Sequence, residues 1–398
     1  MWWTDLDKIP LWPWQGADDF GDDFVAMRDS AWRKLLRSGA RPAALCAALG
    51  WNSSARAGRP SIIDAFLYNG EATLLALRRL ELRGVVSRHA YTISALSFSG
   101  VRRDDELDDL RRPAAAADAG VAEVQVLTVS LEEQQTTCGK LRTHKDRNYC
   151  REALLRNSLA RAADGLAEHD WVLLSDVDEV PDATTLRLLR SCSVPHDVLV
   201  FRSHRHYIYS TACVVTGGAK QYWTSRNAQL AVGPVAVRVS AMRLHGLQAA
   251  RKTRYDCHAV GPHASCTPPA REVLPPSAWH LSSCMPSRAV VHKLGTFSDP
   301  IRTRFARKGK AADLGTVAAV AAVGVAHRGG GGGGDGTNRS TEALRREGVA
   351  AVDQLRASCT DPKGYYEMTR MPAPLSTYPD VPRAVEADSR RFAELMLL

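Results

Sequence analysis

The sequence predicts an α/β fold with a mostly parallel central sheet, because short apolar segments alternate with segments of helical periodicity. The clearest strand is the apolar run at 171–174, which is short, continuous and followed at once by acidic residues, as expected for a buried parallel strand. The chain has 398 residues, of which 45% are hydrophobic and 24% charged. This composition excludes a wholly disordered chain and allows a large buried core.

The predicted elements follow one another as strands and helices in turn. A strand at 61–68 precedes a helix at 72–82, whose apolar positions recur with helical spacing. The remaining elements are a strand, a helix, the central strand, a helix and a strand, at 121–129, 151–166, 171–174, 182–190 and 198–201. Because proline fits the first turn of a helix, Pro181 is expected to start the helix at 182–190.

Three carboxylates follow the central strand within four positions: Asp176, Asp178 and Glu179. Ligands of parallel α/β sheets bind at the carboxyl ends of the strands, and alternate residues of an extended segment point to the same side. Asp176 and Asp178 can therefore converge on one divalent cation that bridges to a diphosphate. The simpler alternative is a solvated acidic loop that caps the next helix.

The same residues also fit the nucleophile motif of haloacid-dehalogenase-like phosphohydrolases, in which Asp176 would attack phosphorus and Asp178 would act as the acid. Residues 334–338 mimic the distal acidic motif of those enzymes, but they follow a polyglycine run instead of a hydrophobic strand. The nucleophile motif is also expected near the N-terminus of its domain, whereas a long α/β pattern precedes it here. A phosphohydrolase is therefore an alternative to the main interpretation.

Four blocks of the chain, in the expected order, resemble glycosyltransferase family 17, the β-1,4-mannosyl-glycoprotein β-1,4-N-acetylglucosaminyltransferases. The blocks lie within 62–82, 151–181, 279–298 and 378–395. The second contains Ser175-Asp176-Val177-Asp178-Glu179-Val180-Pro181, and the third contains Trp279-His280-Leu281-Ser282-Ser283-Cys284 with Lys293-Leu294 after it. The resemblance extends over about 61–306 and 370–398.

This resemblance implies a GT-A-like nucleotide-sugar-binding fold, a UDP-N-acetylglucosamine (UDP-GlcNAc) donor, a Mn²⁺ or Mg²⁺ ion and inversion at the anomeric carbon. The acceptor would be a mannose of an N-glycan or related glycan on a glycoprotein, and the setting the Golgi or secretory lumen. Asp176 and Asp178 are expected to hold the metal. The expected donor contacts are Asp64, Asn69, Asp176 and Trp279, and the candidates for the general base are Glu179, Glu71 and His280.

The chain departs from the family pattern at one strand end. A carboxylate and an amide that are usual there are replaced by Ile93 and Ala95. If the missing glutamate contacts substrate, another donor, another acceptor or weak activity is expected. A catalytically inactive carbohydrate- or nucleotide-binding homologue is therefore a further alternative.

The domain organisation follows from the same patterns. Residues 1–58 form a poorly patterned leader, and 59–306 form the GT-A-like catalytic domain. A Gly-rich, low-complexity insertion is expected at 307–345, followed by a C-terminal segment at 346–398 that packs on the catalytic domain. Neither a signal peptide nor a membrane-spanning helix is expected, so membrane association would need a segment outside this chain.

The remaining features are less specific. The formal net charge of +9 fits an anionic partner, but no nucleic-acid-binding motif accompanies it, and nucleic acid is not an expected partner. A loop disulfide or free thiols, and not zinc, are favoured for the cluster of Cys257, His258, His263 and Cys266.

Two further sets of residues could contact substrate. A basic run could reach the donor diphosphate: Arg302, Arg304, Arg307, Lys308 and Lys310. Four ring-bearing residues after a predicted strand could line an acceptor groove: His204, His206, Tyr207 and Tyr209.

Overall fold

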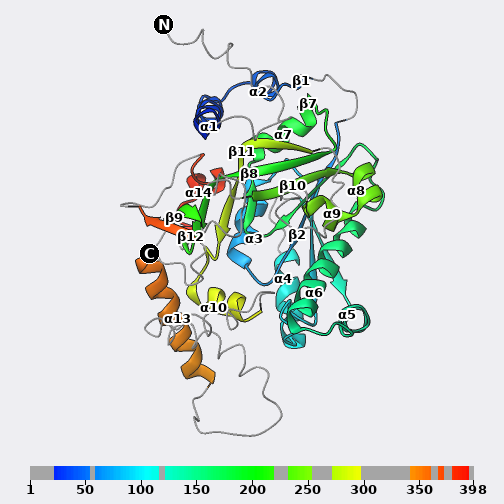
Figure 1. Ribbon diagram of the computed structural model, residues 1–398, viewed down its shortest axis with the longest axis vertical. Helices are drawn as coiled ribbons and strands as arrows, with labels where there is room; N and C mark the ends of the chain where they lie inside the picture. The colour runs from blue at the N-terminus through cyan, green and yellow to red at the C-terminus, as the bar shows by residue number, and fades with distance from the viewer. Residues whose placement is uncertain are drawn as a thin grey trace.

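The computed structural model describes residues 22–53, 59–115, 122–218, 232–252, 271–296, 341–359, 366–371 and 379–393. At its centre is a ten-stranded mixed sheet (Figure 1). Eight strands lie side by side in the order β4 (Glu123–Val129), β3 (Arg88–Ser94), β2 (Ile62–Leu67), β5 (Trp171–Asp176), β10 (Val232–Arg238), β8 (Val198–Ile208), β9 (Ser210–Gly218) and β12 (Tyr366–Arg370). Two further strands lie off this row: β11 (Arg271–Ser282) pairs with β8, and β6 (Glu179–Pro181) pairs with β11.

The half of the sheet from β4 to β5 is parallel, and the half beyond β5 is mainly antiparallel. The predicted α/β class is confirmed, and the predicted parallel arrangement holds for the strands from β4 to β5. In this half, Leu67 at the end of β2 lies opposite Asp176 at the end of β5. The loops that leave these two strands therefore start next to each other, at the edge where α/β sheets bind ligands.

Two apolar clusters cover the two faces of the sheet. Alternate side chains of a strand point to opposite faces, so Ile62 and Phe66 of β2 join one cluster while Ile63 and Ala65 join the other. One face carries α3 (Ala72–Glu81) and α7 (Ala183–Ser191). The other carries α6 (His144–Ser158), α8 (Val239–His245) and α9 (Leu247–Lys252) (Figure 1). Three more helices, α4 (Leu107–Ala115), α5 (Leu131–Cys138) and α10 (Ser287–Thr296), complete this region.

Two sequence predictions need correction. Pro181 does not start the helix, because it ends β6 and lies opposite Ala278 of β11, while Asp182 caps α7 by accepting from the Thr184 N–H at 2.6 Å. The strand expected at 198–201 continues to Ile208. Its second half is rich in polar residues that are buried against partners from distant segments, which hides the strand from local patterns.

The described part of the leader is folded. It contains α1 (Asp22–Arg37), α2 (Pro42–Ala48) and β1 (Asn52–Ser53), which pairs with β7 (Cys192–Ser193). Trp32 of α1 is buried and donates its indole N–H to the Pro276 carbonyl at 2.9 Å. A disulfide between Cys46 and Cys192 joins α2 to the end of α7. Residues 22–53 therefore belong to the core, although the sequence pattern predicted only a poorly patterned leader.

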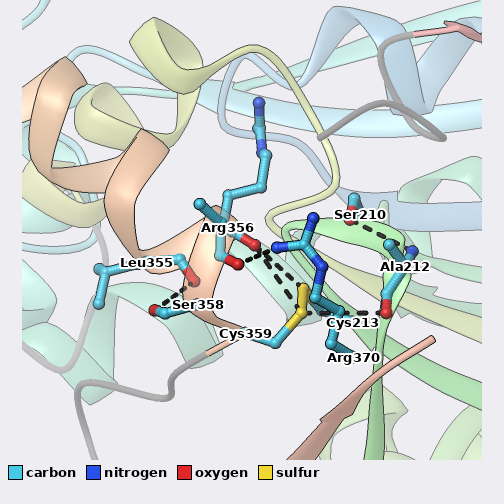
Figure 2. Close-up of a disulfide and its surroundings, with 9 residues drawn as sticks. Ser210, Ala212, Cys213, Leu355, Arg356, Ser358, Cys359 and Arg370 are labelled. Carbon is cyan, nitrogen blue, oxygen red and sulfur yellow. Dashed lines mark hydrogen bonds between the residues drawn. A yellow bond between two sulfur atoms is a disulfide. The ribbon is translucent and has the colours of Figure 1, made fainter. Parts of the chain in front are cut away.

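The C-terminal segment packs on the sheet. Helix α13 (Thr341–Ser358) lies against α10, and β12 extends the sheet beyond β9. The disulfide between Cys213 and Cys359 fastens the end of α13 to β9, and Figure 2 shows Arg370 of β12 beside it. The short α14 (Arg383–Ala387) lies near α3. Most of the Gly-rich insertion expected at 307–345 lies outside the described residues.

One carboxylate, Asp380, connects the beginning and the end of the described chain. It pairs with Arg37 of α1 at 3.4 Å and with Arg205 of β8 at 3.1 Å. Its backbone carbonyl accepts the Tyr207 hydroxyl at 2.7 Å. Within the described ranges, no helix is both long and apolar enough to cross a bilayer.

Candidate active site

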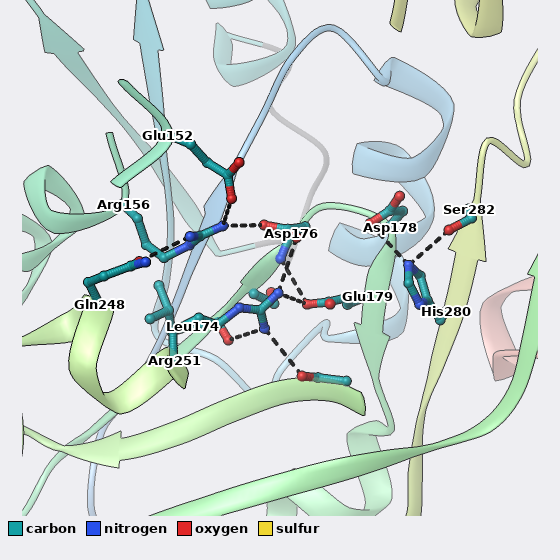
Figure 3. Close-up of polar contacts among 12 residues, drawn as sticks. Glu152, Arg156, Leu174, Asp176, Asp178, Glu179, Gln248, Arg251, His280 and Ser282 are labelled. Carbon is teal, nitrogen blue, oxygen red and sulfur yellow. Dashed lines mark hydrogen bonds and ion pairs between the residues drawn. The ribbon is translucent and has the colours of Figure 1, made fainter. Parts of the chain in front are cut away.

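The acidic turn, defined here as residues 176–179, lies where β5 ends. Asp176 closes β5, and Glu179 begins β6 (Figure 3). Arg78 of α3 holds this turn from the core side, because its guanidinium donates to the backbone carbonyl oxygens of Asp176 at 3.2 Å and Glu179 at 2.7 Å. The turn is therefore a fixed structure and not a solvated loop.

Asp176 is the most accessible carboxylate of the turn, with 37% of its side chain exposed. Two arginines from different helices reach it: Arg156 of α6 at 3.2 Å and Arg251 of α9 at 3.1 Å. Arg156 also pairs with Glu152 at 2.8 Å and donates to Gln248 at 3.0 Å, as Figure 3 shows. Asp176 thus presents a carboxylate to solvent from a rigid, charged frame.

Glu179 is directed inward. It is 2% exposed, pairs with Arg251 at 2.5 Å and accepts the Asp176 backbone N–H at 3.0 Å. The hydrogen bond closes the turn on itself, and the ion pair ties the turn to α9. In this geometry Glu179 positions the turn.

Asp178 contacts groups from two other elements. Its Oδ2 lies 2.7 Å from Lys293 Nζ of α10, and its Oδ1 lies 3.9 Å from His280 Nε2 of β11. Burial alone would raise the pKa of Asp178, but the charge of Lys293 and then that of His280 outweigh it, so the pKa lies below its ordinary value. Asp178 is therefore ionised at neutral pH.

Lys293 also reaches the carboxyl end of β2. Its Nζ lies 3.3 Å from Oε1 of Glu71, the residue that precedes α3. The other oxygen of Glu71 accepts the Asn69 backbone N–H at 2.8 Å, across Gly70, whose φ of +102° suits glycine. The fold thus brings Glu71 and Asp178 to one ammonium group, although they are far apart in the sequence.

Asn69 lies beside these groups and is buried. Its amide donates to Thr296 Oγ1 at 2.6 Å, and its oxygen accepts from Arg103. Burial lowers the pKa of Arg103 to about 10, the charges of Glu106 and Glu71 acting against it. Asn69 therefore ties the end of β2 to the end of α10, next to Glu71 and Lys293.

His280 is held by neighbours on two parallel strands. Its Nε2 lies 2.9 Å from Ser282 Oγ, and its ring stacks on that of His206, which burial and then the charge of His280 keep at a pKa well below its ordinary value. With 21% of its side chain exposed, His280 is the most accessible of the three candidates for the base.

Two predicted donor contacts are corrected by the structure. Asp64 in the middle of β2 is fully buried and pairs with Arg78 at 2.5 Å and with His89 at 2.8 Å. Burial would raise the pKa of Asp64, but Arg78 outweighs it and lowers the pKa. Trp279 is also fully buried, and its indole N–H donates to the Pro379 carbonyl at 2.8 Å. The side chains of Asp64 and Trp279 therefore stabilise the core and are not exposed to a ligand.

Other sequence predictions have mixed outcomes. Of the two positions that depart from the family pattern, Ile93 is completely buried in the core and Ala95 is half-buried. The four residues expected to line an acceptor groove are buried as well: His204, His206, Tyr207 and Tyr209. The Cys/His cluster of Cys257 and the basic run that begins at Arg302 lie outside the described residues.

Sequence reasoning missed the cations of the site: Arg78, Arg156, Arg251 and Lys293. Three of them fall within the blocks that resemble the family, which was the available signal. Arg251 has no such signal, because only the folding of α9 onto β10 and β5 brings it to the acidic turn.

The residues present fit a divalent cation that is shared with a ligand. Among the described residues, no three His, Cys, Asp or Glu side chains form a complete metal cage. However, Mg²⁺ and similar ions are commonly held by one or two carboxylates together with substrate phosphates. At the end of β5, Asp176 and Asp178 supply two such carboxylates, and Asp176 is partly exposed.

The chain was compared with known protein families and structures. The sequence profile of glycosyltransferase family 17 matches residues 35–228, which include β2 to β5 and the acidic turn. No curated protein matches the chain. One similar solved structure is the galactosyltransferase LgtC in complex with donor and acceptor sugar analogues, at 13% identity and a TM-score of 0.26; the match covers 49% of this chain and 64% of that one. Residues 35–228, just under half of the chain, are therefore similar to glycosyltransferase family 17, and this region contains the acidic turn.

Proposed function

We propose that the protein is a metal-dependent, inverting glycosyltransferase that transfers N-acetylglucosamine from UDP-GlcNAc to a mannose of an N-glycan or a related glycan. The observation that carries this proposal is the rigid acidic turn at the joined ends of β2 and β5, with Asp176 partly exposed and Asp178 beside His280. The family match supports the donor and the acceptor class.

The residues of the turn have distinct roles in this proposal. Asp178 and Asp176 would hold Mn²⁺ or Mg²⁺ together with the donor diphosphate. When bound, the ion offsets the negative charge that grows on the leaving diphosphate. Arg156 and Arg251 orient Asp176, while Arg78 fixes the backbone beneath it.

Inversion in a single displacement needs one base for the acceptor hydroxyl. The hydroxyl oxygen bonds to the anomeric carbon as the bond from that carbon to the diphosphate oxygen breaks, and the hydroxyl proton passes to the base. His280 is the candidate that fits this task best, because Glu71 and Glu179 are almost completely buried. Ser282 and His206 keep its ring in place.

The disulfides support a secretory setting. Three form among the described cysteines, and stable disulfides are typical of oxidising compartments. Together with the glycoprotein acceptor, they favour the secretory lumen as the place of action.

The test is transfer and hydrolysis of a panel of UDP-sugars by the full chain, with Mn²⁺ and with EDTA. We expect UDP-GlcNAc to be used only with the metal, and Asp178→Asn to lower kcat/KM at least 100-fold. Asp164→Asn, an exposed carboxylate outside the site, is the matched control and should retain full activity. Full activity of Asp178→Asn would contradict the assignment, and UDP binding without transfer by the wild type would indicate an inactive homologue.

A further inference from the structure

The ammonium group of Lys293 lies between two carboxylates, that of Glu71 after β2 and that of Asp178 after β5. Its Nζ lies 2.7 Å from Asp178 Oδ2 and 3.3 Å from Glu71 Oε1. The side chain is 14% exposed and extends from α10, which packs against α13. The lysine thus enters the site from a separate part of the fold.

One oxygen of Asp178 cannot serve an ammonium group and a divalent ion equally well. At a contact of 2.7 Å the ammonium takes the strongest acceptor position on Oδ2. A metal ion bound to the same carboxylate would lie only a few ångströms from a like charge, and two cations so close in a partly buried site repel each other strongly. The flexible four-carbon stem of lysine allows its ammonium to move to another acceptor.

We propose that Lys293 is a built-in competitor of the metal: its ammonium holds Asp178 in the free protein and leaves that carboxylate when a divalent cation binds with a diphosphate. This inference rests on the proposed function, since it concerns the same site. The diphosphate oxygens supply the new acceptor for the displaced ammonium. Lys293 therefore makes the metal bind weakly alone and tightly with the nucleotide, and by linkage the nucleotide gains as much from the metal.

The experiment measures Mn²⁺ affinity by calorimetry, or by the electron paramagnetic resonance of free Mn²⁺, without nucleotide and with saturating UDP. In the wild type we expect UDP to tighten Mn²⁺ binding at least tenfold. In Lys293→Met we expect Mn²⁺ alone to bind at least fivefold more tightly than in the wild type, and the gain from UDP to shrink. Lys293→Arg keeps a cation in place and should retain weak binding of the metal alone.

Lys145→Met is the matched control, since it removes one exposed positive charge from α6 and should bind Mn²⁺ as the wild type does. If Lys293→Met does not fold, the same comparison is made between Glu71→Gln and the double variant Glu71→Gln/Lys293→Met, in which one carboxylate is already neutral. Mn²⁺ binding to Lys293→Met that is no tighter than to the wild type would overturn the inference. Absence of Mn²⁺ binding to any form would overturn it together with the metal dependence proposed above.

Failure of the proposed function gives a different result. Tighter Mn²⁺ binding by Lys293→Met, combined with no turnover of any UDP-sugar by the wild type, would support the competition and reject the transferase reaction. Transfer by the wild type, combined with equal Mn²⁺ affinities of the wild type and Lys293→Met, would support the transferase reaction and reject the competition.

Discussion

The imidazole rings of His206 and His280 are stacked, with centroids 4.2 Å apart and planes 3° from parallel. The two residues lie opposite each other on the parallel strands β8 and β11. Burial, and then the charge of His280, lower the pKa of His206 well below its ordinary value, so His206 is neutral and can stack without repelling its neighbour. His206 is therefore a positioning residue for His280.

Loss of this stack should reduce catalysis without removing a reacting group. Aromatic pairs contribute about 1 kcal/mol, so we expect His206→Ala to lower kcat/KM about fivefold to tenfold. His206→Phe keeps a flat ring and should restore most of the activity. Steady-state kinetics of the two variants, with thermal unfolding to verify the fold, test this. Equal losses in both variants would show that stacking is not what matters at this position.

Arg251 should be essential for the stability of the acidic turn. Its guanidinium is 2% exposed and pairs with Glu179, which is 2% exposed as well. Removal of one partner of a buried ion pair leaves an uncompensated charge and costs about 3–5 kcal/mol, so Arg251→Met should lose about that much free energy of unfolding. Urea denaturation measures it. Arg243→Met, an exposed arginine of α8, is the control and should change stability by less than about 0.5 kcal/mol. A similar small change in Arg251→Met would show that the turn does not depend on this pair.

Glu81 should make stability decrease as the pH rises. This buried carboxyl accepts the backbone N–H groups of Ala183 and Ala384, at the starts of α7 and α14, and lies near Asp182. Burial, and then the charge of Asp182, raise the pKa of Glu81 to about 7 from 4.5. Because the folded pKa is the higher one, its contribution is complete below pH 4.5 and is lost as the pH rises through 7.

Between pH 5 and pH 8 the wild type should therefore lose about 2–3 kcal/mol relative to Glu81→Gln, which does not ionise. The measurement is urea denaturation of both proteins at the two pH values. The difference between the two proteins removes the effect of other titrating groups. Parallel pH profiles would mean that Glu81 ionises normally in the folded protein.

The disulfides should differ in their contributions to stability. The Cys213–Cys359 bond closes a separation of 146 residues, and the Cys138–Cys150 bond closes one of 12 residues. In the chain-entropy account, these loops correspond to about 5 and about 3 kcal/mol. The double serine variant of each pair, unfolded in urea without reductant, should show the larger loss for Cys213 and Cys359. The reverse order would contradict the entropic account for this protein.

Three strands of the parallel half, β2, β4 and β5, were predicted because their signal is local, whereas β3 was not among the predicted elements. Strands β2 and β5 are continuous apolar runs, and α3 has the apolar spacing of an amphipathic helix. The second half of β8 could not be predicted. Its polar residues Arg202 and His204 are buried only because Asp29 and Asp182 meet them, and these partners are distant in the sequence.

The acidic residues of the site could be predicted from the sequence, but their cationic partners could not. Acidic residues after an apolar strand indicated where the chemistry lies. Their partners depend on tertiary folding, since Arg251 and Lys293 come from helices formed much later in the chain. Asp64 shows the opposite error, because the family resemblance implied a donor contact there, whereas the carboxylate pairs with Arg78 within the core.

The docking of α1 has a consequence for the order in which the protein is assembled. This helix is synthesised before its described partners, which are Arg202, His204, Pro276 and Asp380. The indole of Trp32 therefore cannot donate to the Pro276 carbonyl until β11 has been made, and the ion pair of Arg37 must wait for Asp380. Docking of α1 would therefore follow the synthesis of β8 and β11, and its ion pair with Asp380 would form later still.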